Sequence, residues 1–147
     1  MPLETRILIV AAVVLLAIGL GFLWRITTGR AKRVKAGEIV DLSLLGATKD
    51  GQPVTKFGKR VTFLQFSSEF CSQCVQTARV LREFESHSND ILHIEVDITN
   101  RLDLAKKFHI LQTPTTLVLD HTGRITSRIG GAAQSQTIQD EIGHFTI

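Results

Sequence analysis

Hydrophobic and polar positions divide the chain into one long apolar run and a following region of short mixed segments. Residues 7–24, ILIVAAVVLLAIGLGFLW, contain no charge and almost no polar side chain. A helix of this length extends about 27 Å, which is enough to cross a thin hydrocarbon core. The run ends at Trp24, and an aromatic ring favours the membrane interface. We therefore expect a short tail at residues 1–6 and a transmembrane helix at residues 7–24.

A cleaved signal peptide is the alternative interpretation of the apolar run. Such a peptide has a basic start, a shorter apolar stretch and a small-residue cleavage site. Here only Arg6 precedes the run, the run is long, and the basic segment RITTGRAKRVK follows at once. The pattern favours a retained anchor, followed by a basic linker at residues 25–37.

The rest of the chain, residues 38–147, alternates between strand and helix patterns and is expected to form one α/β domain. Strands are expected at residues 60–66, 91–98, 115–120 and 124–129, and helices at residues 71–87, after Asn100, and from Ser135 to Ile142. Asp50 and Gly51 indicate a hairpin turn before the first strand, while Asn100 and Ser135 are candidate helix caps. The order strand, helix, strand, helix, strand, strand, helix predicts a mixed sheet.

Charge is concentrated at the N-terminal end of the chain. Residues 1–37 carry a net charge of +5 and the remainder a net charge of −2. A basic segment directly after an apolar helix favours anionic headgroups, and the positive-inside rule places residues 25 onward in the cytoplasm. The extracytoplasmic side is the alternative. The slightly acidic main domain gives no support for nucleic-acid binding.

Candidate chemistry is concentrated at the chain's only two cysteines, in the stretch FSSEFCSQCVQT. Cys71 follows a strand and opens a helix, where free N–H groups and the helix dipole stabilise a thiolate. Cys74 lies one turn later on the same face, so the two sulfurs can reach disulfide distance. An activated thiolate beside its own resolving partner is suited to thiol–disulfide exchange.

Three other interpretations of the cysteine pair remain open at this point. A zinc site would need two more ligands, whereas the histidines are scattered singly at positions 87, 93, 109, 121 and 144. A structural disulfide that closes so short a loop would constrain little, and the two cysteines could also be buried and inert. We expect no metal and no bound cofactor, because the redox unit is the cysteine pair itself.

The wider pattern resembles the thioredoxin family over about residues 38–145. The resemblance is carried by FLQFSSEFCSQCVQTARVLREF, EVDITN, LQTPTTLVLDHTGRI and RIGGA, in this order and spacing. DGQPV and TPTTLVLDHTGRI are most similar to the membrane-tethered bacterial branch of that family. The resemblance implies a thioredoxin fold, with a central mixed sheet of four to five strands flanked by helices, preceded here by the transmembrane helix.

The resemblance also implies roles for individual residues. Cys71 would be the attacking nucleophile, Cys74 the resolving thiol, and Pro114 a cis-proline that faces them. The backbone of Thr113 would pair with an extended substrate segment. Supporting positions around the pair are Phe70, Ser72, Gln73 and Gly130. An ordinary trans proline at the start of a strand is the alternative for Pro114.

This chain departs from the family pattern at two positions near the cysteines. Phe70 stands where the family usually has a tryptophan, and Gln65 replaces a buried aspartate. Because glutamine cannot take up a proton, that route for activating Cys74 is absent. Glu69 and Glu95 could substitute, although each also fits a solvated surface charge. His93 could tune the thiols if it faced them, but the pattern favours a half-buried strand histidine.

These features together predict a membrane-tethered thiol–disulfide oxidoreductase that uses Cys71 and Cys74, with reduction as the favoured direction. Its expected partners are protein thiols or disulfides, an unidentified redox donor or acceptor, and the lipid bilayer through residues 7–24. The chain is expected to be a monomer. The alternatives are a non-catalytic module of the same fold that holds a partner, and a redox sensor that acts on itself.

Overall fold

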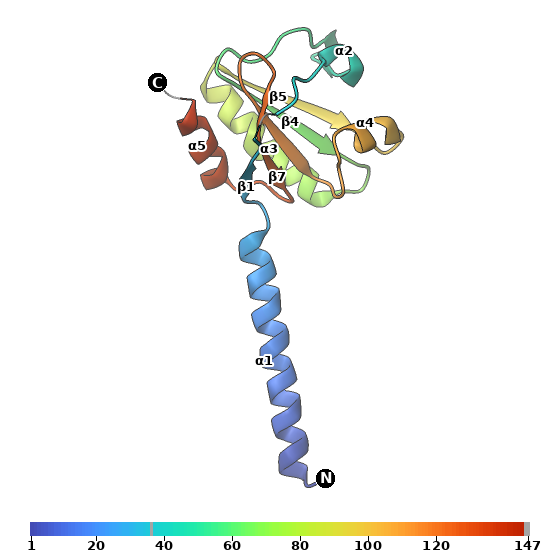
Figure 1. The fold of residues 1–147 in the computed structure, drawn as a ribbon, viewed down its shortest axis with the longest axis vertical. Helices are drawn as coiled ribbons and strands as arrows, with labels where there is room; N and C mark the ends of the chain where they lie inside the picture. The colour runs from blue at the N-terminus through green and yellow to red at the C-terminus, as the bar shows by residue number, and fades with distance from the viewer. Residues whose placement is uncertain (36, 146–147) are drawn as a thin grey trace.

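The computed structural model describes residues 1–35 and 37–145. A long N-terminal helix, α1 (Leu3–Thr27), stands apart from a domain built of a sheet and shorter helices (Figure 1). Helix α1 extends beyond the expected run at both ends, and it is long and apolar enough to cross a membrane. Residues 36, 146 and 147, which belong to the expected linker and main domain, lie outside the described residues.

Five strands form one mixed sheet, which confirms the sheet type expected from the element order. The strands are β1 (Ala31–Arg33), β4 (Val61–Ser67), β5 (Ile91–Asp97), β6 (Thr115–Leu119) and β7 (Ile125–Gly130). Their order across the sheet is β1-β7-β6-β4-β5. The pair β4–β5 is parallel, and the pairs β4–β6, β6–β7 and β1–β7 are antiparallel. The expected central strand is β4, which is buried at all seven positions.

Strand β1 was not expected, because residues 25–37 had been expected to form a basic linker. It pairs antiparallel with β7, with Ala31 opposite Ile129 and Arg33 opposite Ser127. The strand has only three residues, and its Lys32 and Arg33 are of the basic type common on edge strands, so it carries no strand signal of its own. Just before β1, the Gly29 N–H donates to the carbonyl of Gly130 over 2.9 Å. The segment after α1 is therefore attached to the sheet along much of its length.

Four further helices and a small hairpin complete the domain. They are α2 (Leu42–Leu45), α3 (Ser72–His87), α4 (Leu102–Lys107) and α5 (Ser135–His144), with β2 (Thr48–Lys49) and β3 (Gln52–Pro53) joined at the expected turn. Asp50 and Gly51 both have positive φ, as that turn requires. Helix α2 was missed because its four residues are too few to show a helical period.

The two expected helix caps were wrong. The residues at the N-cap positions of α4 and α5 are Arg101 and Gln134, and neither side chain caps its helix within the described chain. Asn100 precedes the N-cap by one residue, and Ser135 is already the first helical residue, so neither occupies the position from which a side chain caps. The helices themselves form where they were expected.

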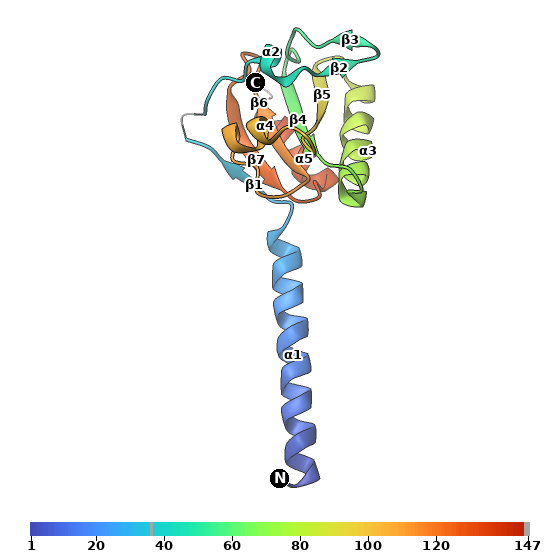
Figure 2. The same ribbon diagram turned by 90° about the vertical axis from the view of Figure 1, so that its right-hand side faces the viewer.

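Apolar side chains pack on both faces of the sheet. On one face, Phe63 and Val118 pack with Leu81 of α3 and Ile138 of α5. On the other face, the buried cluster is Leu64, Phe66, Leu117, Leu45 of α2 and Leu104 of α4, with further residues. Figure 2 shows α3 alongside β4 and β5 at one side of the domain. This packing on both faces fixes the position of β4, and the cysteines follow shortly after the end of β4 in the chain.

Candidate functional site

The cysteine pair lies where β4 passes into α3. Cys71 is the N-cap residue of α3, and the Cys74 N–H donates to its Sγ over 3.2 Å. The two residues are joined by a disulfide, with their Cα atoms 5.2 Å apart. Cys71 is partly exposed, whereas Cys74 is only 2% exposed. A reacting sulfur from solvent therefore reaches Cys71 first.

The loop before β6 lies against the turn that carries the cysteines. The peptide bond from Thr113 to Pro114 is cis, as the resemblance implied. The hydroxyls of Ser68 and Thr113 are 2.8 Å apart and hydrogen-bond to each other. On the other side of the loop, the Gly131 N–H donates to the Pro114 carbonyl over 2.9 Å. Ser68 had not been identified from the sequence, where it stands as one of several small polar residues in a turn.

The remaining expected site residues surround the pair in different ways. Phe70 is fully exposed and has a φ of 59°, in the left-handed region that bulky residues seldom occupy. Ser72 and Gln73 are exposed on the first turn of α3. Gly130 ends β7, and a Cβ there would stand 2.6 Å from the Gln112 amide nitrogen. The site therefore requires a small residue at position 130 unless the Gln112 side chain shifts.

Exposed apolar side chains flank the cysteines. Phe70 and Val75 line the same surface cavity as the pair, and Leu111, which is 96% exposed, stands two residues before Thr113. Val75 is exposed, whereas the buried apolar side chains of α3 include Ala78 and Leu81. Leu111 had not been singled out, although an apolar residue in a loop just before Thr113 and Pro114 is a usable signal. Exposed apolar groups around a reactive sulfur are suited to contact with another protein.

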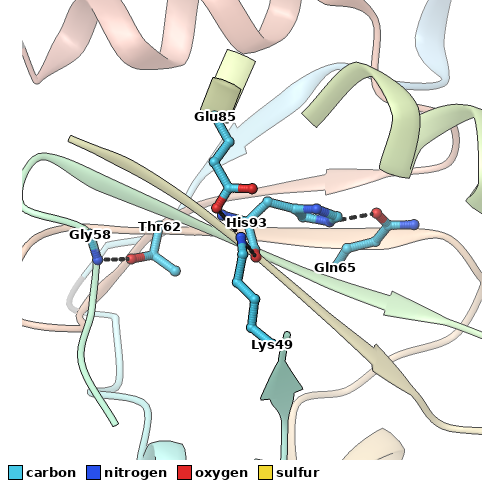
Figure 3. A network of polar contacts seen from close by, with 6 residues as sticks. All are labelled: Lys49, Gly58, Thr62, Gln65, Glu85 and His93. Carbon is cyan, nitrogen blue, oxygen red and sulfur yellow. Dashed lines mark hydrogen bonds and ion pairs between the residues drawn. The ribbon is translucent and has the colours of Figure 1, made fainter. Parts of the chain in front are cut away.

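Figure 3 shows a chain of polar contacts that runs through Gln65, His93 and Glu85. The Gln65 side-chain amide donates to the Cys74 carbonyl over 2.9 Å. Its amide oxygen is 3.0 Å from Nε2 of His93. Because the amide nitrogen is already a donor to a carbonyl, the oxygen must accept, and the proton of His93 therefore sits on Nε2. Gln65 thus links the Cys74 backbone to the His93 side chain through two hydrogen bonds.

His93 is buried and faces this chain of contacts, so its expected half-buried position on the strand was wrong. Its exposed fraction is 5%. Burial lowers its pKa to about 4, against an opposing effect of Glu85 and with smaller contributions from Lys49 and Arg82. Glu85 accepts from the His93 backbone N–H over 3.0 Å and pairs with Lys49. The side chains closest behind Cys74 are therefore uncharged at neutral pH.

The two acids considered as substitutes for the missing aspartate lie on the solvent side. Glu69 is exposed, and its backbone N–H donates to the Thr99 hydroxyl over 2.9 Å. Glu95 forms an ion pair with Arg82 over 3.7 Å. Glu95 also lines the surface cavity that holds both cysteines. Of the two, Glu95 is the acid that shares a surface with the reactive sulfurs.

The chain matches the model of a known protein family. The model of the family described as Thioredoxin matches residues 50–144. Among curated proteins, Thioredoxin H5 of Oryza sativa subsp. japonica is 28% identical over 80 residues. That match covers 54% of this chain and 58% of the relative, so the chain spans less than two thirds of that relative's length.

Solved structures agree with the fold of the domain. The thioredoxin of Fasciola hepatica has a TM-score of 0.53 and 18% identity, covering 60% of this chain and 84% of that one. A thioredoxin from Nicotiana alata has a TM-score of 0.53 and 20% identity, covering 60% of this chain and 76% of that one. At these identities the likeness establishes a thioredoxin fold, with a mixed sheet flanked by helices.

Proposed function

Since the chain belongs to the thioredoxin family, we propose that it is a thiol–disulfide oxidoreductase, tethered to a membrane by α1, that reduces disulfides of other proteins. The observation that carries the proposal is the placement of Cys71. It is partly exposed at the start of α3, bonded to a buried partner three residues later, and near the loop that carries the cis-proline. These features match the requirements of an attacking thiol with a resolving partner.

The reduced form would act in two displacement steps. The Cys71 thiolate attacks one sulfur of a substrate disulfide, so that this bond breaks and a mixed disulfide forms, with release of one substrate thiolate. Cys74 then loses its proton and attacks Cys71, which releases the second substrate thiolate and leaves the Cys71–Cys74 disulfide. Two electrons pass to the substrate, whose thiolates take up two protons. Renewed turnover needs a dithiol donor.

Substrate positioning is assigned to the residues around Cys71. The Thr113 backbone would pair with an extended segment, as an added strand does. Phe70 would supply an apolar contact, Ser72 and Gln73 are the exposed residues that follow Cys71 on α3, and Gly130 leaves room for the Gln112 side chain. The exposed apolar side chains and the neighbouring cis-proline support this arrangement.

The proposed location is a membrane, with the domain in the cytoplasm as a monomer. Support comes from the apolar length of α1 and from the basic residues in its last turn and after it, including Arg25, Arg30 and Lys32. The cytoplasm keeps thiols reduced, so that side favours a reductase. On the opposite side of the membrane, the same residues would act on exported thiols.

The test is reduction of insulin disulfides by the full chain in detergent micelles, with dithiothreitol as electron donor. We expect turnover for the natural chain, loss of at least a hundredfold for Cys71→Ser, and an unchanged rate for the distant surface control His121→Ala. A folded chain that forms the Cys71–Cys74 disulfide reversibly but reduces no insulin would instead identify a self-acting sensor. A folded chain without exchange in either direction would identify a binding module.

A further inference from the structure

The tether and the substrate loop are joined by a short series of contacts. Only Thr28 separates the last residue of α1 from Gly29, whose N–H donates to the Gly130 carbonyl over 2.9 Å. The next residue, Gly131, donates to the Pro114 carbonyl over 2.9 Å. The Thr28 methyl group packs against Gly131, where a Cβ would come within 2.4 Å of it. Two backbone hydrogen bonds, from Gly29 to Gly130 and from Gly131 to Pro114, thus link the end of α1 to the loop of the cis-proline.

A surface cavity connects the same two regions. It is lined on one side by Trp24 and Thr28 and on the other by Leu111, Gln112 and Gly130. Leu111 therefore shares a cavity with the end of α1 and stands two residues before Thr113 in the chain. The exposed apolar side chains of the site begin directly beside the anchor.

The ribbon views place the start of α3 at the same end of the domain. Figures 1 and 2 show the earlier, greener end of α3 toward the side from which α1 leaves the domain, and the β6–β7 turn at the opposite side. Strand β4 runs between these two ends, and its seven residues extend about 23 Å. The cysteines therefore lie closer to α1 than the β6–β7 turn does, and the difference is about the length of one strand.

The tether leaves little freedom to turn this end away from a bilayer. Residue 29 is already bonded to β7, and residues 31–33 are paired along it. Arg25, Arg30 and Lys32 lie at the same junction, where anionic headgroups attract them. A globular substrate that must approach from the membrane side would meet lipid first, whereas a segment that emerges from the bilayer can reach Cys71 directly.

We propose that the substrate of Cys71 is a disulfide in another membrane protein, held within a few residues of the bilayer surface. This inference rests on the proposed reductase function and specifies its substrate class. The electron transfer is the one described above: the reduced pair gives two electrons to the membrane protein's disulfide, and a small dithiol restores the pair. Leu111 and Phe70 contact the segment that emerges from the membrane.

The experiment uses the full chain in vesicles of phosphatidylcholine and phosphatidylglycerol, with dithiothreitol as reductant. The first probe is a transmembrane peptide that carries a fluorophore and quencher joined by a disulfide about five residues beyond the bilayer. A second probe places the same disulfide behind a helical spacer of about 20 residues, or about 30 Å. A third is the disulfide segment alone in solution. We expect the near probe to be reduced at least tenfold faster than the spaced probe at equal surface density.

A matched variant moves the cysteines away from the bilayer without changing any residue of the site. Inserting about 15 helix-forming residues between Ile26 and Thr27 raises the domain by about 22 Å. This variant should favour the spaced probe and keep its rate on the soluble probe. Equal rates on near and spaced probes, or faster reduction of the soluble probe, would overturn the inference and leave the proposed function in place. No reduction of any probe by a folded chain would overturn the proposed function itself.

A depth measurement checks the placement independently of activity. Trp24 is the single tryptophan, so Trp24→Phe allows a new one to be placed at will. Phe70→Trp in that background should be strongly quenched by lipids that carry a quencher on the headgroup. His121→Trp, in the β6–β7 turn, should be quenched little. Quenching of position 121 that equals or exceeds that of position 70 would contradict the placement.

Discussion

The two sides of the cysteine pair have opposite surroundings. Beside Cys71, the apolar side chains of Phe70 and Val75 are exposed to solvent. Behind Cys74, polar groups are buried and hydrogen-bonded to one another through Gln65 and His93. The exposed side can be changed with little cost to the fold, so it is free to determine what binds. The buried side holds the sulfur in position and contributes mainly to stability.

The largest expected difference comes from removing a phenylalanine ring at a buried position of β4 and at the exposed position beside Cys71. Phe66 is fully buried against Phe108, so Phe66→Ala should lower the free energy of unfolding by about 3–5 kcal/mol. Phe70 is fully exposed, and Phe70→Ala should change it by no more than about 0.5 kcal/mol. Denaturant unfolding of both variants measures the contrast. Comparable losses at the two positions would contradict the assignment of an exposed and a buried side.

The next largest effect is a dependence of stability on pH. Burial lowers the pKa of His93 to about 4 in the folded chain, from about 6.5 when unfolded. The unfolded chain therefore takes up the proton first, so stability falls as the pH is lowered from about 6.5 to about 4. The loss attributable to His93 approaches about 3 kcal/mol at the lower limit.

His93→Gln is the control for that pH dependence, because glutamine can still donate to Gln65 but does not titrate. Unfolding curves of both chains between pH 7 and pH 4 give the difference. Glu85, Lys49 and Arg82 face His93 and remain in both chains, so their own effects largely cancel. Parallel pH profiles would show that His93 is not buried as a neutral group.

A smaller effect on stability is expected from removing the hydrogen bonds of Gln65 to Cys74 and His93. Gln65→Leu keeps the approximate volume but leaves the Nε2 proton of His93 and the Cys74 carbonyl without the amide partner. A buried polar group without a partner costs about 1–3 kcal/mol, which should appear in the free energy of unfolding. Gln65→Glu restores an acceptor for His93, and it should recover part of the loss. A neutral outcome for Gln65→Leu would mean that water replaces the amide.

The smallest effect on stability, with a selective effect on activity, is expected at Phe70. Phe70→Ala should raise KM for insulin about three- to tenfold, because an apolar contact of one ring is lost. Exchange with a small dithiol should keep its rate, since that reaction needs no extended contact. Phe70→Trp should restore the KM. An equal loss with both substrates would assign Phe70 to the thiol chemistry and remove it from substrate contact.

The elements with a strong local signal could be predicted from the sequence. Strand β4, helix α3 and the hairpin at Asp50 and Gly51 formed where they were expected, because each carries its own periodicity or turn residues. Strand β1 and helix α2 could not be predicted, since three and four residues show no period. The pairing of β1 depends on β7, which lies almost a hundred residues later in the chain.

The candidate site also contains some features that have a local sequence signal and others that have none. The cysteine pair and the Thr113–Pro114 loop carry recognisable spacing, and the structure has the disulfide and the cis bond. The contact between Gln65 and His93 joins two neighbouring strands, so it depends on register and burial, which single residues do not reveal. The nearness of α1 to Pro114 likewise follows from edge pairing alone.

The most direct test of the central claim is to trap the mixed disulfide. Cys74→Ser retains the attacking thiol and removes the resolving one, so the full chain should accumulate a covalent complex with a disulfide-containing peptide. We expect mass spectrometry to locate the bond at Cys71, and dithiothreitol to release it. Cys71→Ser should form no such complex. A complex formed equally well by Cys71→Ser, or no complex with either folded variant, would contradict the assignment of Cys71 as the nucleophile.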